Sequence, residues 1–211
     1  MAEMTIDIET YSSVDLTKCG VYRYVEAPDF EILLFGYAYN DDPVQVIDLT
    51  AFEDIPAQVM KDLTSPAVTK TAYNANFERT CIAKHFGITC DPHQWKCTSV
   101  HALTLGLPGN LASVASFSIP CKPTKANGGR TRNYPHHAPE KWAEFIEYNR
   151  QDVVVEREIR RKLSRFPVPA HEWKLWALDQ HINDFGVRLD KQLAERAIAC
   201  DAQYGDRLLQ E

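Results

Sequence analysis

Two acidic side chains near the start of the chain, Asp7 and Glu9, are the first residues whose type and spacing suggest chemistry. They lie in residues 4–10, where apolar and polar residues alternate, and this period of two is typical of a strand with one buried face. Residues two apart on a strand project from the same face, so the two carboxylates should lie several ångströms apart. Such a pair can hold cations, and the ordinary alternative is a solvated strand face.

A third acid, Asp152, lies in the most regular predicted helix of the chain, which begins at Pro139 and runs to about Leu163. Burying an uncompensated carboxylate costs several kcal/mol, so an Asp in a core-facing stripe needs a cationic partner or a bound metal. Tyr148 lies one turn earlier on the same face and can reach the same site. The alternative is a surface-edge Asp beside a core Tyr. Apolar residues surround Asp152 at spacings of three and four, as in an amphipathic helix: Phe145, Tyr148, Val155 and Ile159.

The third element is the segment from Asn74 to Glu78, where a predicted strand over 67–73 runs into a predicted helix over 76–86. Carboxylates are favoured in the first turn of a helix, so Glu78 also has an ordinary structural explanation. Taken alone, this segment does not indicate a site.

In chain order, Asp7-Ile8-Glu9-Thr10, Asn74-x-x-x-Glu78 and Tyr148-x-x-x-Asp152 resemble the three motifs of the tyrosine-bearing (DEDDy) branch of the DnaQ-like exonucleases. The wider sequence is similar to the N-terminal exonuclease region of phage and prophage family A DNA polymerases, over residues 7–13, 20–24, 73–79 and 148–153. The resemblance spans nearly the whole chain. It departs from the family at Glu78, where Asp is usual, and in a shorter segment over residues 111–120.

The resemblance implies a 3′→5′ exonuclease that uses two divalent ions, Mg²⁺ or Mn²⁺, to release nucleoside monophosphates from single-stranded or frayed DNA. It implies Asp7, Glu9 and Asp152 as the principal metal ligands. Glu78 then helps to bind metal through water, and Tyr148 orients the attacking water. Two alternatives remain: the same chemistry on RNA or short oligonucleotides, and a non-catalytic nucleic-acid-binding remnant of a polymerase. The intact set of five residues argues against the remnant.

Substrate contacts are expected at two places. Thr10 and Asn74, beside the implied ligands, match family positions that contact the terminal nucleotide. Four cations within eleven residues that contain no acid form a basic loop, which suits the phosphates of a single strand or is simply solvated: Lys122, Lys125, Arg130 and Arg132. The expected partner is therefore the 3′ end of single-stranded DNA, with RNA and a separate polymerase as further partners.

Composition sets the class of protein. The 211 residues carry a net charge of −6, which argues against a protein that coats nucleic acid. No apolar run approaches 18 residues and no secretory signal opens the chain, so a cytoplasmic protein without a membrane span is expected. Cysteine and histidine spacing matches no zinc pattern, and the six cysteines are expected to be reduced thiols.

The remaining pattern predicts an α/β chain with the RNase H-like (DnaQ-like) fold, a mixed central sheet flanked by helices and a short helical C-terminal tail. Strands are expected over 32–39 and 44–49, joined as a hairpin, and helices over 55–63 and 98–105. Residues 116–138 are expected to be loop, and the basic residues between 157 and 165 to form the wet face of the long helix. We predict an exonuclease domain over residues 1–165. A helical tail over 166–211, with helices near 170–183 and 190–209, resembles the start of a polymerase region.

Overall fold

A computed structural model of the protein describes residues 2–116, 136 and 138–208. Its five-stranded sheet has the order β3-β2-β1-β4-β5. The first three strands in the chain pair antiparallel, whereas β1, β4 and β5 pair in parallel, so the predicted mixed sheet is confirmed. The strands are β1 (Ala2–Tyr11), β2 (Glu31–Tyr39), β3 (Gln45–Asp48), β4 (Val68–Ala72) and β5 (Trp95–Cys97).

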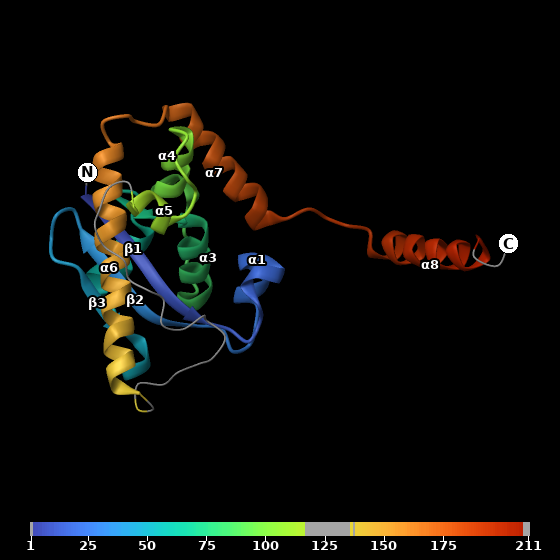
Figure 1. The fold of residues 1–211 in the computed structure, drawn as a ribbon, viewed down its shortest axis with the longest axis horizontal. Coiled ribbons are helices and arrows are strands. Elements are labelled where there is room, and N and C mark those ends of the chain that lie inside the picture. The colour runs from blue at the N-terminus through green and yellow to red at the C-terminus, as the bar shows by residue number, and fades with distance from the viewer. Residues whose placement is uncertain (1, 117–135, 137, 209–211) are drawn as a thin grey trace.

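Helices cover both faces of this sheet (Figure 1). The long helix α6 (Pro139–Leu163) packs across β1 and β2 on one face, and α3 (Ala75–Phe86) packs with α1 (Leu16–Val25) on the other. The remaining elements are shorter helices beside the sheet and, after α6, the helices of the C-terminal tail. They are η1 (Leu49–Ala51), α2 (Ala57–Thr64), η2 (Pro92–Gln94), α4 (Thr98–Thr104), α5 (Leu111–Ser116), α7 (Ala170–Phe185) and α8 (Lys191–Leu208).

The side chains of strand β1 point alternately into the apolar core and toward the opposite face of the sheet. Met4, Ile6 and Ile8 are buried in the largest apolar cluster, on the face that α1 and α3 cover. Each such side chain contributes about 1.5–3 kcal/mol relative to an exposed one. Because side chains alternate across a strand, Asp7 and Glu9 must then lie on the opposite face, toward α6. The apolar pattern of β1 therefore fixes the direction of its acids.

The predicted strands and helices agree with the structure, but the sequence pattern did not reveal α1, α5, β5 or the two 3₁₀ helices η1 and η2. The long helix α6 has the predicted bounds, and α3 ends at Gly87, which takes the left-handed conformation that suits a glycine cap. Helix α1 contains a non-helical residue, Gly20, at φ 71°, and this break hides its periodicity. Strand β5 has only three residues, too few to show a period of two.

Two arginines predicted on the wet face of α6 instead attach that helix to the sheet. Arg160 forms an ion pair with Glu3 on β1. The guanidinium of Arg157 donates to the backbone carbonyl oxygens of Asn40 and Asp42, in the turn after β2. The expectation was wrong for Arg160, whose contact with Glu3 is part-buried, whereas the hydrogen bonds of Arg157 lie at the exposed surface.

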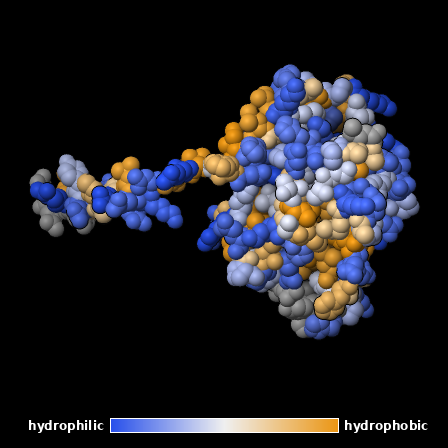
Figure 2. Space-filling model, turned by 180° about the vertical axis from the view of Figure 1, so that it is seen from behind, coloured by the Kyte–Doolittle hydropathy of each residue, from blue (hydrophilic) through white to orange (hydrophobic). Residues whose placement is uncertain are grey.

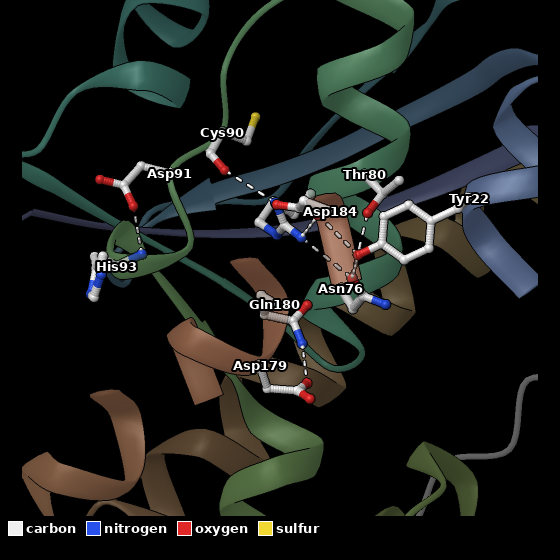
Figure 3. Close-up of polar contacts among 10 residues, drawn as sticks. Tyr22, Asn76, Thr80, Cys90, Asp91, His93, Asp179, Gln180 and Asp184 are labelled. Carbon is white, nitrogen blue, oxygen red and sulfur yellow. Dashed lines mark hydrogen bonds and ion pairs between the residues drawn. The ribbon is translucent and has the colours of Figure 1, made fainter. Parts of the chain in front are cut away.

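Helix α7 packs against the body through a part-buried ion pair near its C-terminal end. The buried guanidinium of Arg79 on α3 donates to both carboxylate oxygens of Asp184, at 2.6 and 2.7 Å. Tyr22 on α1 donates to the same carboxylate at 2.9 Å, and Figure 3 shows Asp184 beside Tyr22 and Asn76. Three helices thus meet at one carboxylate. The predicted division of the chain at residue 165 stays a prediction.

Beyond α7 the chain leaves the body. Residues Phe185, Val187 and Leu189 are exposed, and α8 lies apart from the sheet (Figure 1). Figure 2 shows apolar surface along the segment that leads to α8. Within the described part of the chain, no helix has the length and apolar character that a membrane crossing requires.

Candidate metal centre

Three carboxylates meet between β1 and α6. Asp7, Glu9 and Asp152 each offer an oxygen, and these three oxygens lie within 4.8 Å of one another. All three side chains are half-buried. The sequence prediction that these distant acids come together is therefore confirmed by their geometry, whereas their role as metal ligands stays a prediction.

The sheet register explains how α6 comes close enough to β1. Asp7 lies opposite Gly36 on β2, and α6 passes above this pair. On the other side of β1, the pairing with β4 runs only to Thr5 and Thr71, so the chain leaves β4 beside the acids and turns into α3. Between Glu9 and Thr10 the register with β2 shifts, as at a β-bulge, a feature that re-aims side chains next to many active sites.

The electrostatics of Asp7 show that negative charge accumulates here. Burial raises the pKa of Asp7 well above its ordinary value, and the nearby carboxylates of Glu9, Asp152 and Glu78 raise it further. The side-chain amide of Asn149 opposes this shift, because its Nδ2 donates to Asp7 Oδ2 at 2.6 Å. Like charges at this separation repel one another, so the site favours protons or cations.

Tyr148 lies beside the cluster, one helical turn before Asp152. Burial raises the pKa of Tyr148, and a side-chain hydrogen bond to Asp152 together with the charges of Asp152, Glu9 and Asp7 adds to the effect. The phenol therefore keeps its proton throughout the neutral range and can serve as a hydrogen-bond donor.

Glu78 lies in the first turn of α3, apart from the three-carboxylate group but close enough to act on Asp7 and Glu9. Burial raises its pKa to about 8, with Glu156 and Glu9 contributing, while a backbone N–H lowers it. Among the described residues, Glu78 Oε2 is buried without a hydrogen-bond partner. Such an atom is costly to leave unsatisfied, so it indicates a missing ligand or water.

Behind this site lies a fifth carboxylate, Glu156, which is almost wholly buried. Thr98 Oγ1 donates to Glu156 Oε1 at 2.5 Å, from the first residue of α4. Burial raises the pKa of Glu156 to about 7, and its hydrogen bonds to Thr98 and Thr71 lower it. Glu156 therefore links α6 to α4 and to the sheet, next to Glu78.

Asn149 and Glu156 were not among the residues predicted from the sequence, although the helix carries a signal. Both are buried, at positions seven residues apart. Continuing that spacing in both directions gives Trp142 and Leu163, which are also buried. Polar residues inside an otherwise apolar heptad position must have buried partners. Of the predicted stripe, Val155 and Ile159 are buried as expected, whereas Phe145, Tyr148 and Asp152 are half-buried.

The residues that are predicted to contact the substrate lie in different environments. Thr10 Oγ1 is hydrogen-bonded to Tyr24 Oη at 3.0 Å, which ties the end of β1 to α1. Asn74 is exposed at the start of α3, and its side chain does not cap that helix. The basic loop lies outside the described residues, so its four predicted contacts are untested: Lys122, Lys125, Arg130 and Arg132.

Comparison with known proteins gives one relative of high sequence identity. A DNA polymerase of Bacillus phage SP02 is 58% identical over 229 aligned residues, which cover the whole of this chain. The chain spans 35% of the length of that polymerase. No protein-family model matches the chain.

Solved structures share the fold at much lower sequence identity. The catalytic core of RRP6 from Trypanosoma brucei has a TM-score of 0.58 at 16% identity, covering 89% of this chain and 48% of that chain. Brucella melitensis NrnC has a TM-score of 0.53 at 16% identity, both with bound Mg²⁺ and bound to pGG. These two structures cover 87% of this chain, and the chain covers 86% and 85% of them, respectively. The chain therefore has the RNase H-like fold of the DnaQ-like exonucleases, and it is similar over its whole length to a phage DNA polymerase.

Proposed function

We propose that the chain is a metal-dependent 3′→5′ exonuclease that hydrolyses single-stranded or frayed DNA and releases nucleoside monophosphates. The observation that carries this proposal is the convergence of Asp7, Glu9 and Asp152, whose ligand oxygens lie within 4.8 Å of one another. The high identity to a phage DNA polymerase supports DNA as the substrate.

The donor set fits Mg²⁺ or Mn²⁺. These ions prefer oxygen ligands and keep several waters, so a few carboxylates suffice. Asp7, Glu9 and Asp152 would hold them. The buried Oε2 of Glu78 has no hydrogen-bond partner among the described residues and would be available to a water of the same site. When bound, two such ions would activate the attacking water and stabilise the leaving 3′ oxygen.

The protein's own side chains have separate tasks in this proposal. Tyr148 keeps its proton, since its pKa is raised, and its hydroxyl would orient the attacking water. Asp7 and Asp152 supply negative charge from two different elements, so both strand and helix must be in place for binding. Thr10 and Asn74 would contact the terminal nucleotide, and the basic loop around Lys125 would hold the phosphates of the strand.

A second candidate keeps the chemistry and changes the substrate to RNA or short oligonucleotides. The structure of NrnC bound to pGG favours it, because that protein shares this fold and binds an oligonucleotide. We further propose that a separate polymerase is a partner of this chain, since its relative combines the matching region with a polymerase.

The test uses single strands of DNA and RNA with the same sequence, labelled at the 5′ end and incubated with Mg²⁺ or Mn²⁺. We expect a ladder of products that shorten one nucleotide at a time, and faster loss of the DNA strand. Immediate release of a labelled mononucleotide would show the opposite polarity, and faster loss of RNA would favour the second candidate. Asp7→Ala is the control. If this variant degrades both strands as fast as the native chain, or if neither protein degrades them, the proposal is wrong.

A further inference from the structure

We propose that Asn149 and Gly36 together form a positioning device for Asp7. Asn149 would hold the carboxylate of Asp7 in the orientation that binds a cation, and Gly36 would provide the space in which Asn149 can do so. This inference rests on the proposed function, because it assigns the pair a role in the metal centre.

The first observation is the hydrogen bond itself. Asn149 is fully buried on α6, and its Nδ2 donates to Asp7 Oδ2 at 2.6 Å. The donor fixes the side-chain orientation of one carboxylate oxygen of Asp7 and leaves the other oxygen to a different partner. Outer hydrogen bonds of this kind orient metal ligands in many proteins.

The second observation is that Asn149 fills this position at a cost. Its Oδ1 is buried and has no hydrogen-bond partner in the described part of the chain. An unsatisfied buried acceptor costs about 1–3 kcal/mol, so packing alone would favour an apolar side chain here. Turning the amide over would place Oδ1 against the carboxylate of Asp7, which repels it. The orientation of Asn149 is therefore set by Asp7.

The third observation is the fit to Gly36. Gly36 lies directly across from Asp7 in the sheet. A Cβ atom built at Gly36 would overlap Asn149 Oδ1 and would lie 3.1 Å from Cγ2 of Val153, the next buried residue of α6. Any side chain at position 36 would push the amide of Asn149, and with it α6, away from the sheet. The absence of a Cβ therefore sets how closely α6 approaches β1.

The uncharged nature of the donor is consistent with this role. An Arg or Lys in the place of Asn149 would also bind Asp7, but it would neutralise the carboxylate and repel a divalent cation. An amide orients Asp7 while leaving its negative charge available. Asn149 is therefore suited to a carboxylate that must bind metal rather than form an ion pair.

The neighbouring residue supplies a matched control. Arg150 Nη1 donates to the carbonyl oxygen of Val44 at 2.5 Å, so it also attaches α6 to the sheet region, without any contact to Asp7. Loss of this hydrogen bond should lower the stability of the protein, as loss of Asn149 would if Asn149 had only a structural role. It should not change the affinity of the site for metal.

The experiment measures the dissociation constant of Mn²⁺ by isothermal titration calorimetry for the native chain and four variants. Asn149→Leu keeps the approximate shape of the side chain and removes the donor, and Gly36→Ala keeps Asn149 and removes its space. Both variants should bind Mn²⁺ about 10-fold more weakly, the lower end of the effect expected for a lost outer-shell partner. Arg150→Ala should bind Mn²⁺ within about 2-fold of the native chain, and Asp7→Ala should lose the site. Thermal melting of each variant confirms that the protein is folded.

The outcomes separate the two proposals. If the native chain binds Mn²⁺ and both Asn149→Leu and Gly36→Ala bind it equally well, the positioning role is wrong while the metal centre stands. Equal weakening in Arg150→Ala would also overturn it, since the effect would then be structural. If the native chain binds no Mn²⁺, or Asp7→Ala binds it unchanged, both the metal centre and the positioning role are wrong. If Asn149→Leu does not fold, Gly36→Ala decides between the same outcomes.

Discussion

Replacing Glu78 by Gln should stabilise the metal-free protein at neutral pH and make its stability less sensitive to pH. Glu78 is buried, and its Oε2 has no hydrogen-bond partner among the described residues. Burial raises its pKa to about 8 from an ordinary value of 4.5, and the charges of Glu156 and Glu9 contribute. Gln has nearly the same shape and carries no charge, so the variant removes the cost of keeping this group protonated.

The sign of the effect follows from proton binding. The folded protein holds a proton on Glu78 up to about pH 8, whereas the unfolded chain releases it near pH 4.5. Between these values the folded state binds more protons, so the free energy of unfolding falls as the pH rises. This contribution of Glu78 is fully present below pH 4.5 and is lost as the pH approaches 8. A difference of one pKa unit corresponds to about 1.4 kcal/mol, so the 2.5 units between pH 4.5 and pH 7 correspond to about 3 kcal/mol.

The assay is urea unfolding in EDTA at pH 5, 6 and 7, for the native chain, for Glu78→Gln and for the exposed control Glu140→Gln. The free energy of unfolding of Glu78→Gln should exceed that of the native chain by an amount that grows with pH, reaching about 3 kcal/mol at pH 7. The control should parallel the native chain. Parallel curves for Glu78→Gln and the native chain would show that Glu78 is not held protonated by its surroundings, and the reasoning would then fail.

Three other predictions concern catalysis, metal binding and the attachment of α7. Tyr148→Phe should slow hydrolysis about 100-fold without changing the dissociation constant of Mn²⁺, and an unchanged rate would remove Tyr148 from the catalytic set. Mn²⁺ at 100 times its dissociation constant should raise the free energy of unfolding by about 2.7 kcal/mol in the native chain. It should have no such effect in Asp7→Ala, and an equal effect there would place the ion elsewhere. Asp184→Ala leaves the buried guanidinium of Arg79 unpaired, so it should lower the free energy of unfolding by about 3 kcal/mol and expose α7 to limited proteolysis. The exposed Asp179→Ala should do neither, and equal behaviour of the two variants would show that the ion pair does not hold α7.

The parts of the site that the sequence predicts are those that depend on local periodicity. Alternation over residues 4–10 places Asp7 and Glu9 on one face of β1, and the bounds of α6 follow from Pro139 and the apolar spacing. Spacing within a strand or helix determines which side chains share a face, but it does not bring two elements together. The meeting of Asp152 with Asp7 was predicted from the resemblance of the motifs, since no local rule connects them.

Asn149 and Glu156 could not be predicted in the same way, because their roles depend on residues distant in the chain. The partner of Asn149 is Asp7, and the space it occupies exists only because Gly36 faces it. The partner of Glu156 is Thr98, at the start of a helix that packs on α6 only in the folded protein. Sequence periodicity shows only that both are polar residues at a helix position that is otherwise apolar. Only the tertiary structure shows what satisfies them.

The cations that pair with other carboxylates of the structure show how the setting of Asp7 differs from theirs. The buried guanidinium of Arg79 is used to hold α7 through Asp184, and Arg160 holds α6 to β1 through Glu3. At Asp7, by contrast, the influence that lowers its pKa is an uncharged amide, while burial and neighbouring carboxylates raise it. If Asp7 served only the fold, a buried cation beside it would stabilise the fold better than a proton-dependent arrangement. The fold instead accepts a pH-dependent loss of stability at Asp7, which is the expected consequence of a site whose compensating charge comes from bound divalent ions.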